Sequence, residues 1–182
     1  DSTISADTDD QIDFKAGGTD RMSVTSSGID VTGAITASSA SSINVTGGSA
    51  LTLTSTDAGS SAGPVLRLTR DSSSPADGDI TGEIDFIAEN DAGEAITYSQ
   101  ISSRIDDASD GSEDGRLFFF TQVGGSSTER LRLNGTETAF NEGGADLDFR
   151  VESDGQTHAL FVDAGNDVIG MGASNPGSFN AS

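Results

Sequence analysis

The sequence is built from short runs in which apolar and polar residues alternate, separated by turns rich in glycine, serine and asparagine. Alternation with a period of two is typical of β-strands that bury one face, and frequent turn residues favour hairpins. No window keeps the i, i+3, i+4, i+7 apolar spacing of a helix for three turns. The pattern therefore predicts an all-β chain whose individual strands are too short to be stable alone.

Large apolar side chains are scarce in this chain. Val, Ile, Leu and Phe make up 38 of the 182 residues, which is close to the level of about 20% below which chains remain disordered. A compact single-chain core is hard to build from so few side chains, because apolar burial must offset the entropy lost on ordering the backbone. The composition favours a core shared between several copies of the chain.

The chain is strongly acidic, with 30 Asp and Glu residues, nine Lys and Arg residues and a net charge of −21. This charge disfavours nucleic acid and anionic lipid as partners. It fits solubility in a salty medium, where exposed charges are screened beyond about 10 Å; the alternative is acidity selected for a cationic partner. Cysteine is absent and no apolar run approaches 18 residues, so neither disulfides nor membrane insertion is expected.

Three segments are predicted from the spacing of strands and turns. Residues 1–62 form a repetitive shaft of very short strands, residues 63–134 a central antiparallel β-domain, and residues 135–182 a second repetitive shaft. Within the first shaft, the low-complexity stretch 36–42 fits either a flexible linker or tight winding about a symmetry axis. Strands are predicted near 22–24, 29–31, 43–45, 51–53, 65–70, 79–89, 95–106, 116–123 and 128–133.

One predicted strand is apolar at four successive positions, 117–120. Successive side chains of a strand point to opposite faces, and a strand that is apolar on both faces is buried on both. One face would meet the sheet's own core and the other a neighbouring copy, so we expect an elongated, intertwined homotrimer with a β-helical or β-prism-like shaft. The residues expected in its shared core are Ile84, Phe86, Leu117, Phe118, Phe119 and Phe120.

Short patterns recur on both sides of the central domain. The motif IDFK at 12–15 recurs as LDFR at 147–150, and residues 19–28 recur as 128–135 and, more loosely, as 157–165. Each copy of the second pattern is a short alternating strand that ends in a turn. Repetition of this kind is typical of a structure built along an axis.

The sequence contains no recognisable catalytic or cofactor motif. His158 is the only histidine, which disfavours a zinc site, and the G-x-S-x-G elbow of Ser–His–Asp hydrolases is absent. Four acidic residues within eight positions suggest calcium, but their spacing does not match calcium loops, and solvated hairpin loops are favoured. These weak calcium candidates are Asp107, Asp110, Glu113 and Asp114. We expect no enzymatic activity, cofactor or metal.

The order of several motifs resembles modules of bacteriophage tail fibre and tailspike proteins. The motifs are 65–68 (VLRL), 82–86 (GEIDF), 112–119 (SEDGRLFF), 128–133 (TERLRL) and 161–176, the last being similar to the D-x-x-G-N-V-G-I-G-T-x-x-P repeats of such fibres. The resemblance covers most of residues 10–176. It implies a β-rich parallel homotrimer of the kind found upstream of intramolecular chaperone domains. It also implies a place in the virion beside other tail proteins, in contact with polysaccharide or another receptor on the host surface.

The leading hypothesis is a structural segment of a phage tail fibre that serves as a spacer and an attachment module. A bacterial surface adhesin or surface-layer stalk would have a similar acidic, cysteine-free, repetitive sequence and is the alternative. A glycan depolymerase is less favoured, because carbohydrate clefts commonly use aromatic rings, and here Trp is absent and Tyr98 is the only tyrosine.

Overall fold

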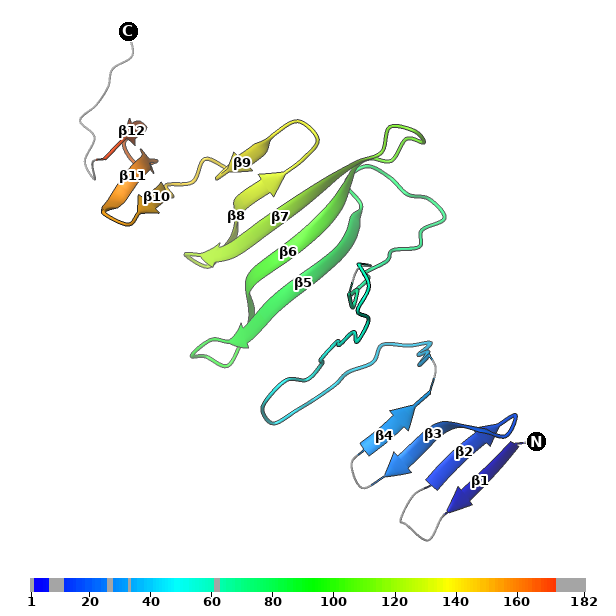
Figure 1. The fold of residues 1–182 in the computed structure, drawn as a ribbon. Helices are drawn as coiled ribbons and strands as arrows, with labels where there is room; N and C mark the ends of the chain where they lie inside the picture. The colour runs from blue at the N-terminus through cyan, green and yellow to red at the C-terminus, as the bar shows by residue number, and fades with distance from the viewer. Residues whose placement is uncertain (1, 7–11, 26–27, 33, 61–62, 173–182) are drawn as a thin grey trace. The chain divides into compact units, whose positions relative to one another are not determined.

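The chain folds into antiparallel β-sheets. A computed structural model describes residues 2–6, 12–25, 28–32, 34–60 and 63–172. These residues form twelve strands and no helix, arranged as three sheets (Figure 1), so the all-β prediction is confirmed. The chain divides into two compact units, Asp1–Val65 and Leu66–Ser182. The turn predicted at 26–28 and the end of the last predicted repeat, 173–176, lie wholly or partly outside the described residues.

The first unit holds a four-stranded meander, in which each strand pairs with the next in the chain. Its strands are β1 (Ser2–Ala6), β2 (Ile12–Ala16), β3 (Thr19–Thr25) and β4 (Gly28–Val31). The predicted strands at 22–24 and 29–31 are confirmed. Those at 43–45 and 51–53 are wrong, because the described residues 34–60 contain no strand. Single apolar residues among Ser, Thr and Gly find no partner strand there within this chain.

The second unit holds a five-stranded and a three-stranded meander. The five strands are β5 (Ile80–Glu89), β6 (Ala95–Asp107), β7 (Asp114–Val123), β8 (Ser126–Leu133) and β9 (Thr138–Phe140). The three are β10 (Phe149–Ser153), β11 (Gln156–Asp163) and β12 (Val168–Gly170). Strands β5 to β8 confirm four predicted strands, and β9 extends the sheet beyond the predicted end of the central domain at residue 134.

The predicted strand at 65–70 is wrong, because this segment joins no sheet. Its side chains hold it against the start of β5 instead. The Leu68 side chain lies so close to Gly82 that a Cβ added to residue 82 would stand 2.9 Å from the Leu68 Cβ. Arg70 forms an ion pair with Asp79, with 3.0 Å between Nη2 and Oδ1. Side-chain contacts thus replace the backbone ladder that the alternating pattern predicted.

Two hairpins each have a Gly-Gly pair as their turn. Gly17 and Gly18 join β2 to β3, and Gly124 and Gly125 join β7 to β8; all four have φ between 55° and 82°. Two-residue loops with positive φ at both positions are type I′ turns, whose twist matches that of the paired strands. Glycine takes this backbone conformation without the strain that a side chain would add.

Asn141 forms the turn after β9. Its φ of 59° lies in the left-handed region, which Asn tolerates better than most residues. Its Nδ2 donates a hydrogen bond to the carbonyl of Ala145 (2.7 Å), and its Oδ1 accepts one from the Ala145 amide (3.1 Å). The side chain therefore clamps the turn that leads towards β10.

We expect Asn141→Ala to lower the free energy of unfolding by about 2–3 kcal/mol. The left-handed backbone costs alanine about 1 kcal/mol, and each lost hydrogen bond costs about 0.5–1.5 kcal/mol. Asn141→Gly removes the same hydrogen bonds without the backbone strain, so its loss should be smaller. Urea unfolding of both variants measures the difference, and a larger loss for glycine would contradict this account.

Candidate interaction surface

Three sets of three consecutive strands, here called the three-stranded meanders, pair in a related way. They are β2–β3–β4 within the four-stranded sheet, β7–β8–β9 within the five-stranded sheet, and β10–β11–β12. In the first two, Phe14 pairs with Met22 and Phe119 pairs with Leu131 at equivalent positions. A one-residue bulge in the middle strand lies beside each of these pairs. Bulges re-aim a strand and are built features of a sheet, so the two meanders share more than strand order.

The bulge carries the same backbone hydrogen bond in both meanders. Its extra residue is Arg21 in β3 and Arg130 in β8. The amide of Thr32 donates to the carbonyl of Arg21 (3.0 Å), and the amide of Asn141 donates to the carbonyl of Arg130 (3.2 Å). Each donor is the residue that follows the third strand. The repeats predicted at 19–28 and 128–135 are therefore equivalent in structure as well as in sequence.

The third three-stranded meander is a looser copy of the other two. Its register shows that one pair of repeated sequence motifs is aligned incorrectly. The IDFK and LDFR motifs align two phenylalanines. In the sheets, Ile12 pairs with Val24 and Phe149 pairs with Val162, and these two valines hold equivalent places in β3 and β11. Phe149 therefore corresponds to Ile12, and the alignment of the two motifs is out of register by two residues.

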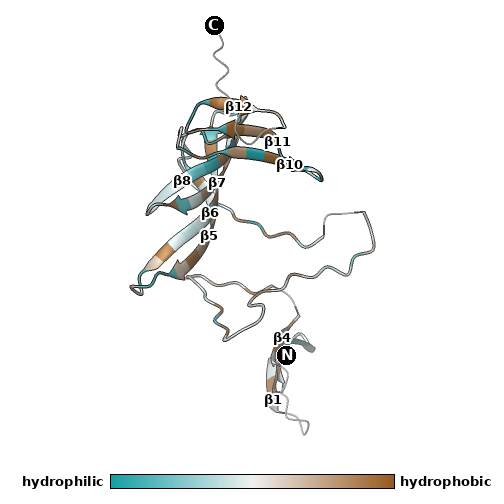
Figure 2. Ribbon diagram, turned by 90° about the vertical axis from the view of Figure 1, so that its left-hand side faces the viewer, coloured by the Kyte–Doolittle hydropathy of each residue, from teal (hydrophilic) through white to brown (hydrophobic). Residues whose placement is uncertain are grey.

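Each meander gathers apolar side chains on one face, because residues paired across strands point to the same side. The five-stranded sheet carries an unbroken apolar row across all its strands: Ile84, Ile101, Phe119, Leu131 and Phe140. The four-stranded sheet carries the row Ile4, Phe14, Met22 and Val31. Apolar and polar residues both occur along the strands (Figure 2), and residues 117–120 of β7 are all apolar.

Three outer members of these rows are exposed in the single chain, and the other members, among them Phe119 and Met22, are partly buried. Ile84 is 41% exposed, Phe140 53% and Ile4 72%. Among the described residues, the large apolar side chains that are buried are Phe118 and Phe161, at 4% and 7% exposed, and both lie on the opposite faces of their sheets. Contiguous apolar faces of this kind mark interaction surfaces.

The six residues predicted for the shared core divide between the two faces of the five-stranded sheet. The register places Ile84, Phe86, Leu117 and Phe119 on the apolar face and Phe118 and Phe120 on the other. The predicted opposite orientation of the two pairs in β7 is confirmed. Arg104 and Arg116 of the same sheet cover Phe118, with guanidinium carbons 4.9 and 6.0 Å from the centre of its ring. The second face is therefore mainly polar.

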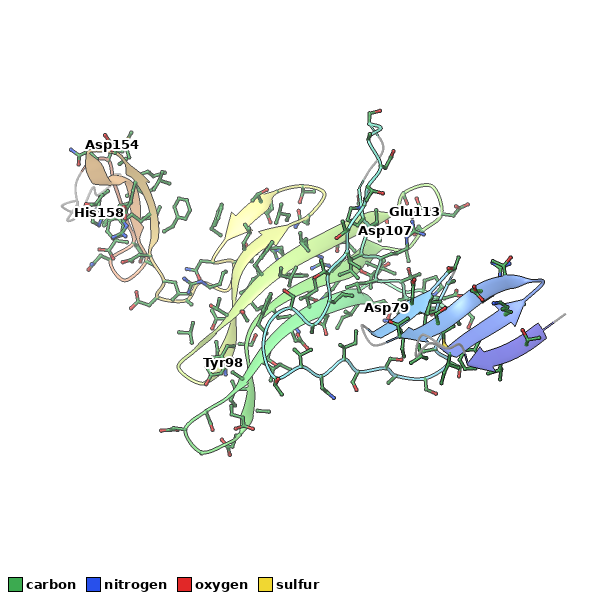
Figure 3. The ribbon with its side chains drawn as sticks, turned by 60° about the horizontal axis from the view of Figure 1, so that its bottom comes forward. Asp79, Tyr98, Asp107, Glu113, Asp154 and His158 are labelled. Carbon is green, nitrogen blue, oxygen red and sulfur yellow. The ribbon has the colours of Figure 1, made fainter. Side chains whose placement is uncertain are left out.

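The four weak calcium candidates do not form a metal site. Asp107 ends β6 and Glu113 precedes β7, at the end of the sheet far from Tyr98 (Figure 3). The Asp107 Oδ1 accepts a hydrogen bond from the Ser109 amide (2.8 Å), and Asp114 begins β7 while Asp110 lies in the loop. Within the part of the chain that the structure describes, no three His, Asp or Glu side chains are grouped to hold a metal ion.

Asp107 is expected to stabilise its loop in a pH-dependent way. The hydrogen bonds from the amide and then the hydroxyl of Ser109 lower the pKa of Asp107 from 3.8. A folded-state pKa below the unfolded one means that the contribution is present above pH 3.8 and lost as the pH falls through the folded pKa. Asp107→Ala should therefore destabilise at about pH 7 and much less at about pH 2. Urea unfolding at both pH values measures this, with Asp110→Ala as the control.

Two grooves lie on the sheets of the second unit. One, of about 310 Å³, lies at the end of the five-stranded sheet near residues 95–100 and is lined by amides, hydroxyls and Phe120, without a charged side chain. The other is lined by Asp148, Arg150 and Glu152 together with His158, whose ring meets Phe161 edge-on with 4.9 Å between centroids. His158 lies in β11, as predicted for a strand residue, with its Nδ1 3.0 Å from the Thr157 hydroxyl.

Across the described residues, the structure contains no helix that is long and apolar enough to cross a membrane. The sequence matches no family model, and no similar protein was found among curated proteins or among solved structures.

Proposed function

We propose that the chain is a structural segment of a bacteriophage tail fibre that assembles as a homotrimer through the apolar faces of its sheets. The observation that carries the proposal is the apolar row that crosses each sheet without a second layer over it in the described residues. An antiparallel sheet with one apolar face normally buries that face against another layer. We propose that another chain supplies this layer.

A second copy of the same chain fits this requirement best. The meanders share their register and bulge, so another copy offers each apolar row a surface of matching size and spacing. The scarcity of large apolar residues points the same way, because a core built from several copies needs fewer of them per chain. The number of copies, three, is the one that the resemblance to tail fibres implies.

The role that follows is mechanical. Meanders pair their strands locally, so units placed one after another along the chain extend a fibre and act as a spacer. The described residues 34–60 form no strand, and their small Ser, Thr and Gly residues suit winding against other copies. The polar faces would then point outward, towards the host surface. We propose that the chain lies in the virion tail, outside the cell, beside other tail proteins.

Sedimentation equilibrium tests the assembly directly. A homotrimer has three times the chain mass of 18.5 kDa, or 55.5 kDa, whereas a stable species of 18.5 kDa over the full concentration range would overturn the proposal. Antibodies raised against the chain distinguish the two biological settings in electron micrographs. Labelling of virion tails supports a tail fibre, and labelling of the bacterial surface supports the alternative of an adhesin or surface-layer stalk.

A further inference from the structure

The polar face of the five-stranded sheet concentrates positive charge in an acidic chain. Arg104 in β6 lies directly opposite Arg116 in β7, and Arg132 in β8 lies directly opposite Phe118. Three of the nine Lys and Arg residues of the whole chain thus surround one phenylalanine. Like charges placed directly opposite each other destabilise a sheet, so this arrangement needs a compensating interaction.

Part of the compensation comes from the aromatic rings. The guanidinium carbons of Arg104 and Arg116 lie 4.9 and 6.0 Å from the centre of the Phe118 ring, within the range of cation–π attraction. The Phe118 ring stacks in turn on Phe120, with 5.4 Å between centroids. Because Phe118 is buried, it fixes the position of both guanidinium groups.

Carboxylates compensate two of the three arginines. Arg116 forms an ion pair with Asp106. Arg132 forms ion pairs with Glu142 (2.6 Å) and Glu137 (3.4 Å), and the hydrogen bond that Arg132 donates to Glu142 raises the pKa of Arg132. These two guanidinium groups therefore have anionic partners within their own chain.

Arg104 has no such partner in the part of the chain that is described. Its side chain forms no ion pair or hydrogen bond there, and its Nε is buried without a hydrogen-bond partner. The acidic residues of β5 on this face are engaged elsewhere: Glu83 accepts a hydrogen bond from the Ser102 hydroxyl (3.0 Å), and Asp85 accepts one from the Gln100 amide (2.7 Å). Arg104 therefore differs from Arg116 and Arg132 in having no carboxylate partner, whereas all three arginines have a buried Nε without a hydrogen-bond partner.

We propose that Arg104, with Arg116 beside it, binds an oxyanion, the carboxylate or phosphate group of an external ligand. A guanidinium group presents a planar fork of donors that fits carboxylate and phosphate groups in a bidentate way. The bound anion would also relieve the repulsion between the two arginines. The net charge of the chain does not prevent this, because charges farther than about 8 Å are largely screened at physiological ionic strength.

The site lies on the face opposite the apolar row. It therefore stays accessible when the apolar face is covered in the proposed assembly. The oxyanion site itself does not depend on that assembly. Arg104 and Arg116 come from adjacent strands that the register holds together, so no rearrangement of the backbone is needed to form the site.

The test uses inorganic phosphate and acetate as probes, titrated into the full chain at constant ionic strength while backbone amide resonances are followed by NMR. Saturable shifts at Arg104, Gly115 and Arg116 are expected. Arg104→Gln should weaken binding at least tenfold. Arg67→Gln, which removes the same charge from an exposed arginine outside the sheets, should change it less than twofold. Absence of saturable shifts, or equal binding by Arg104→Gln, would overturn the proposal.

The same variants separate this site from the assembly. If another copy of the chain supplies the carboxylate, Arg104→Gln weakens self-association and neither probe binds the assembled wild type, which overturns the proposal of an external ligand. If the wild type is a monomer but binds phosphate at Arg104, the oxyanion site stands and the proposed fibre assembly falls. Sedimentation of each variant beside the titration distinguishes these outcomes.

Discussion

Replacing Phe119 by aspartate is expected to convert the assembled protein into monomers. Phe119 is the central member of the apolar row of the five-stranded sheet, with Ile101 on one side and Leu131 on the other. In the trimer, the new carboxylate would be buried in each copy without a partner, at a cost of about 3–5 kcal/mol per chain. A loss of 3 kcal/mol weakens binding more than about a hundredfold. Sedimentation equilibrium should then return 18.5 kDa in place of 55.5 kDa, three times that mass.

The matched control is Gln122→Asp. Gln122 lies on the same strand but on the polar face, so the variant adds the same charge where water can reach it and should leave assembly unchanged. Phe119→Leu keeps the row apolar and should also assemble. The circular dichroism of Phe119→Asp should keep its β-sheet signal, because the row is partly exposed in the single chain. A trimer that survives Phe119→Asp would show that this face is not shared.

Replacing Phe118 by alanine is expected to destabilise the five-stranded sheet strongly even where the protein is monomeric. Phe118 is 4% exposed, and it supports two arginine side chains and the ring of Phe120. Truncating a buried phenylalanine costs about 3–5 kcal/mol, a large share of the 5–15 kcal/mol that stabilises a typical domain. Thermal unfolding at a concentration below assembly measures the loss.

Phe120→Ala provides the comparison for this second prediction. Phe120 lies on the same face but is only partly buried, so its truncation should cost clearly less than that of Phe118. If both variants lost the same stability, burial beneath the arginine pair would not be what makes Phe118 important. Neither substitution touches the apolar row, so residual folded protein should still associate.

The strands could be predicted from the sequence where a segment of alternating apolar and polar residues lies next to a turn. β5 to β8 largely follow such patterns. A two-residue turn joins β7 to β8, and longer loops join β5 to β6 and β6 to β7. The stretch 65–70 has the same alternation, but Leu68 and Arg70 make side-chain contacts with the start of β5 instead of a ladder. Apolar pairs near 43 and 51 have no neighbouring strand among the residues that the structure describes. Alternation shows which residues share a face, and only a partner strand makes them a sheet.

The interaction surface was only partly predictable. The sequence indicates that Leu117 and Phe119 share a face, but it does not show that Ile101 and Phe140 continue their row, because that depends on the register of four strand pairs. The pairing of Arg104 with Arg116 was missed for the same reason: twelve positions separate them in the chain. The paired glycines at 124–125 and the arginine of TERL were available signals, since a two-residue turn followed by a bulge sets the register of β7 and β8.

The outer strand edge of each three-stranded meander affects how such a chain can change over evolutionary time. In the first meander the outer edge of β2 pairs with β1, and in the second the corresponding edge of β7 pairs with β6, whereas among the described strands β10 pairs only with β11. Strands added at this edge leave the register of the three-stranded unit intact. New hairpins can therefore be added to one three-stranded meander while the other meanders keep their structure. The edge of β10 is the natural position at which to engineer an additional hairpin.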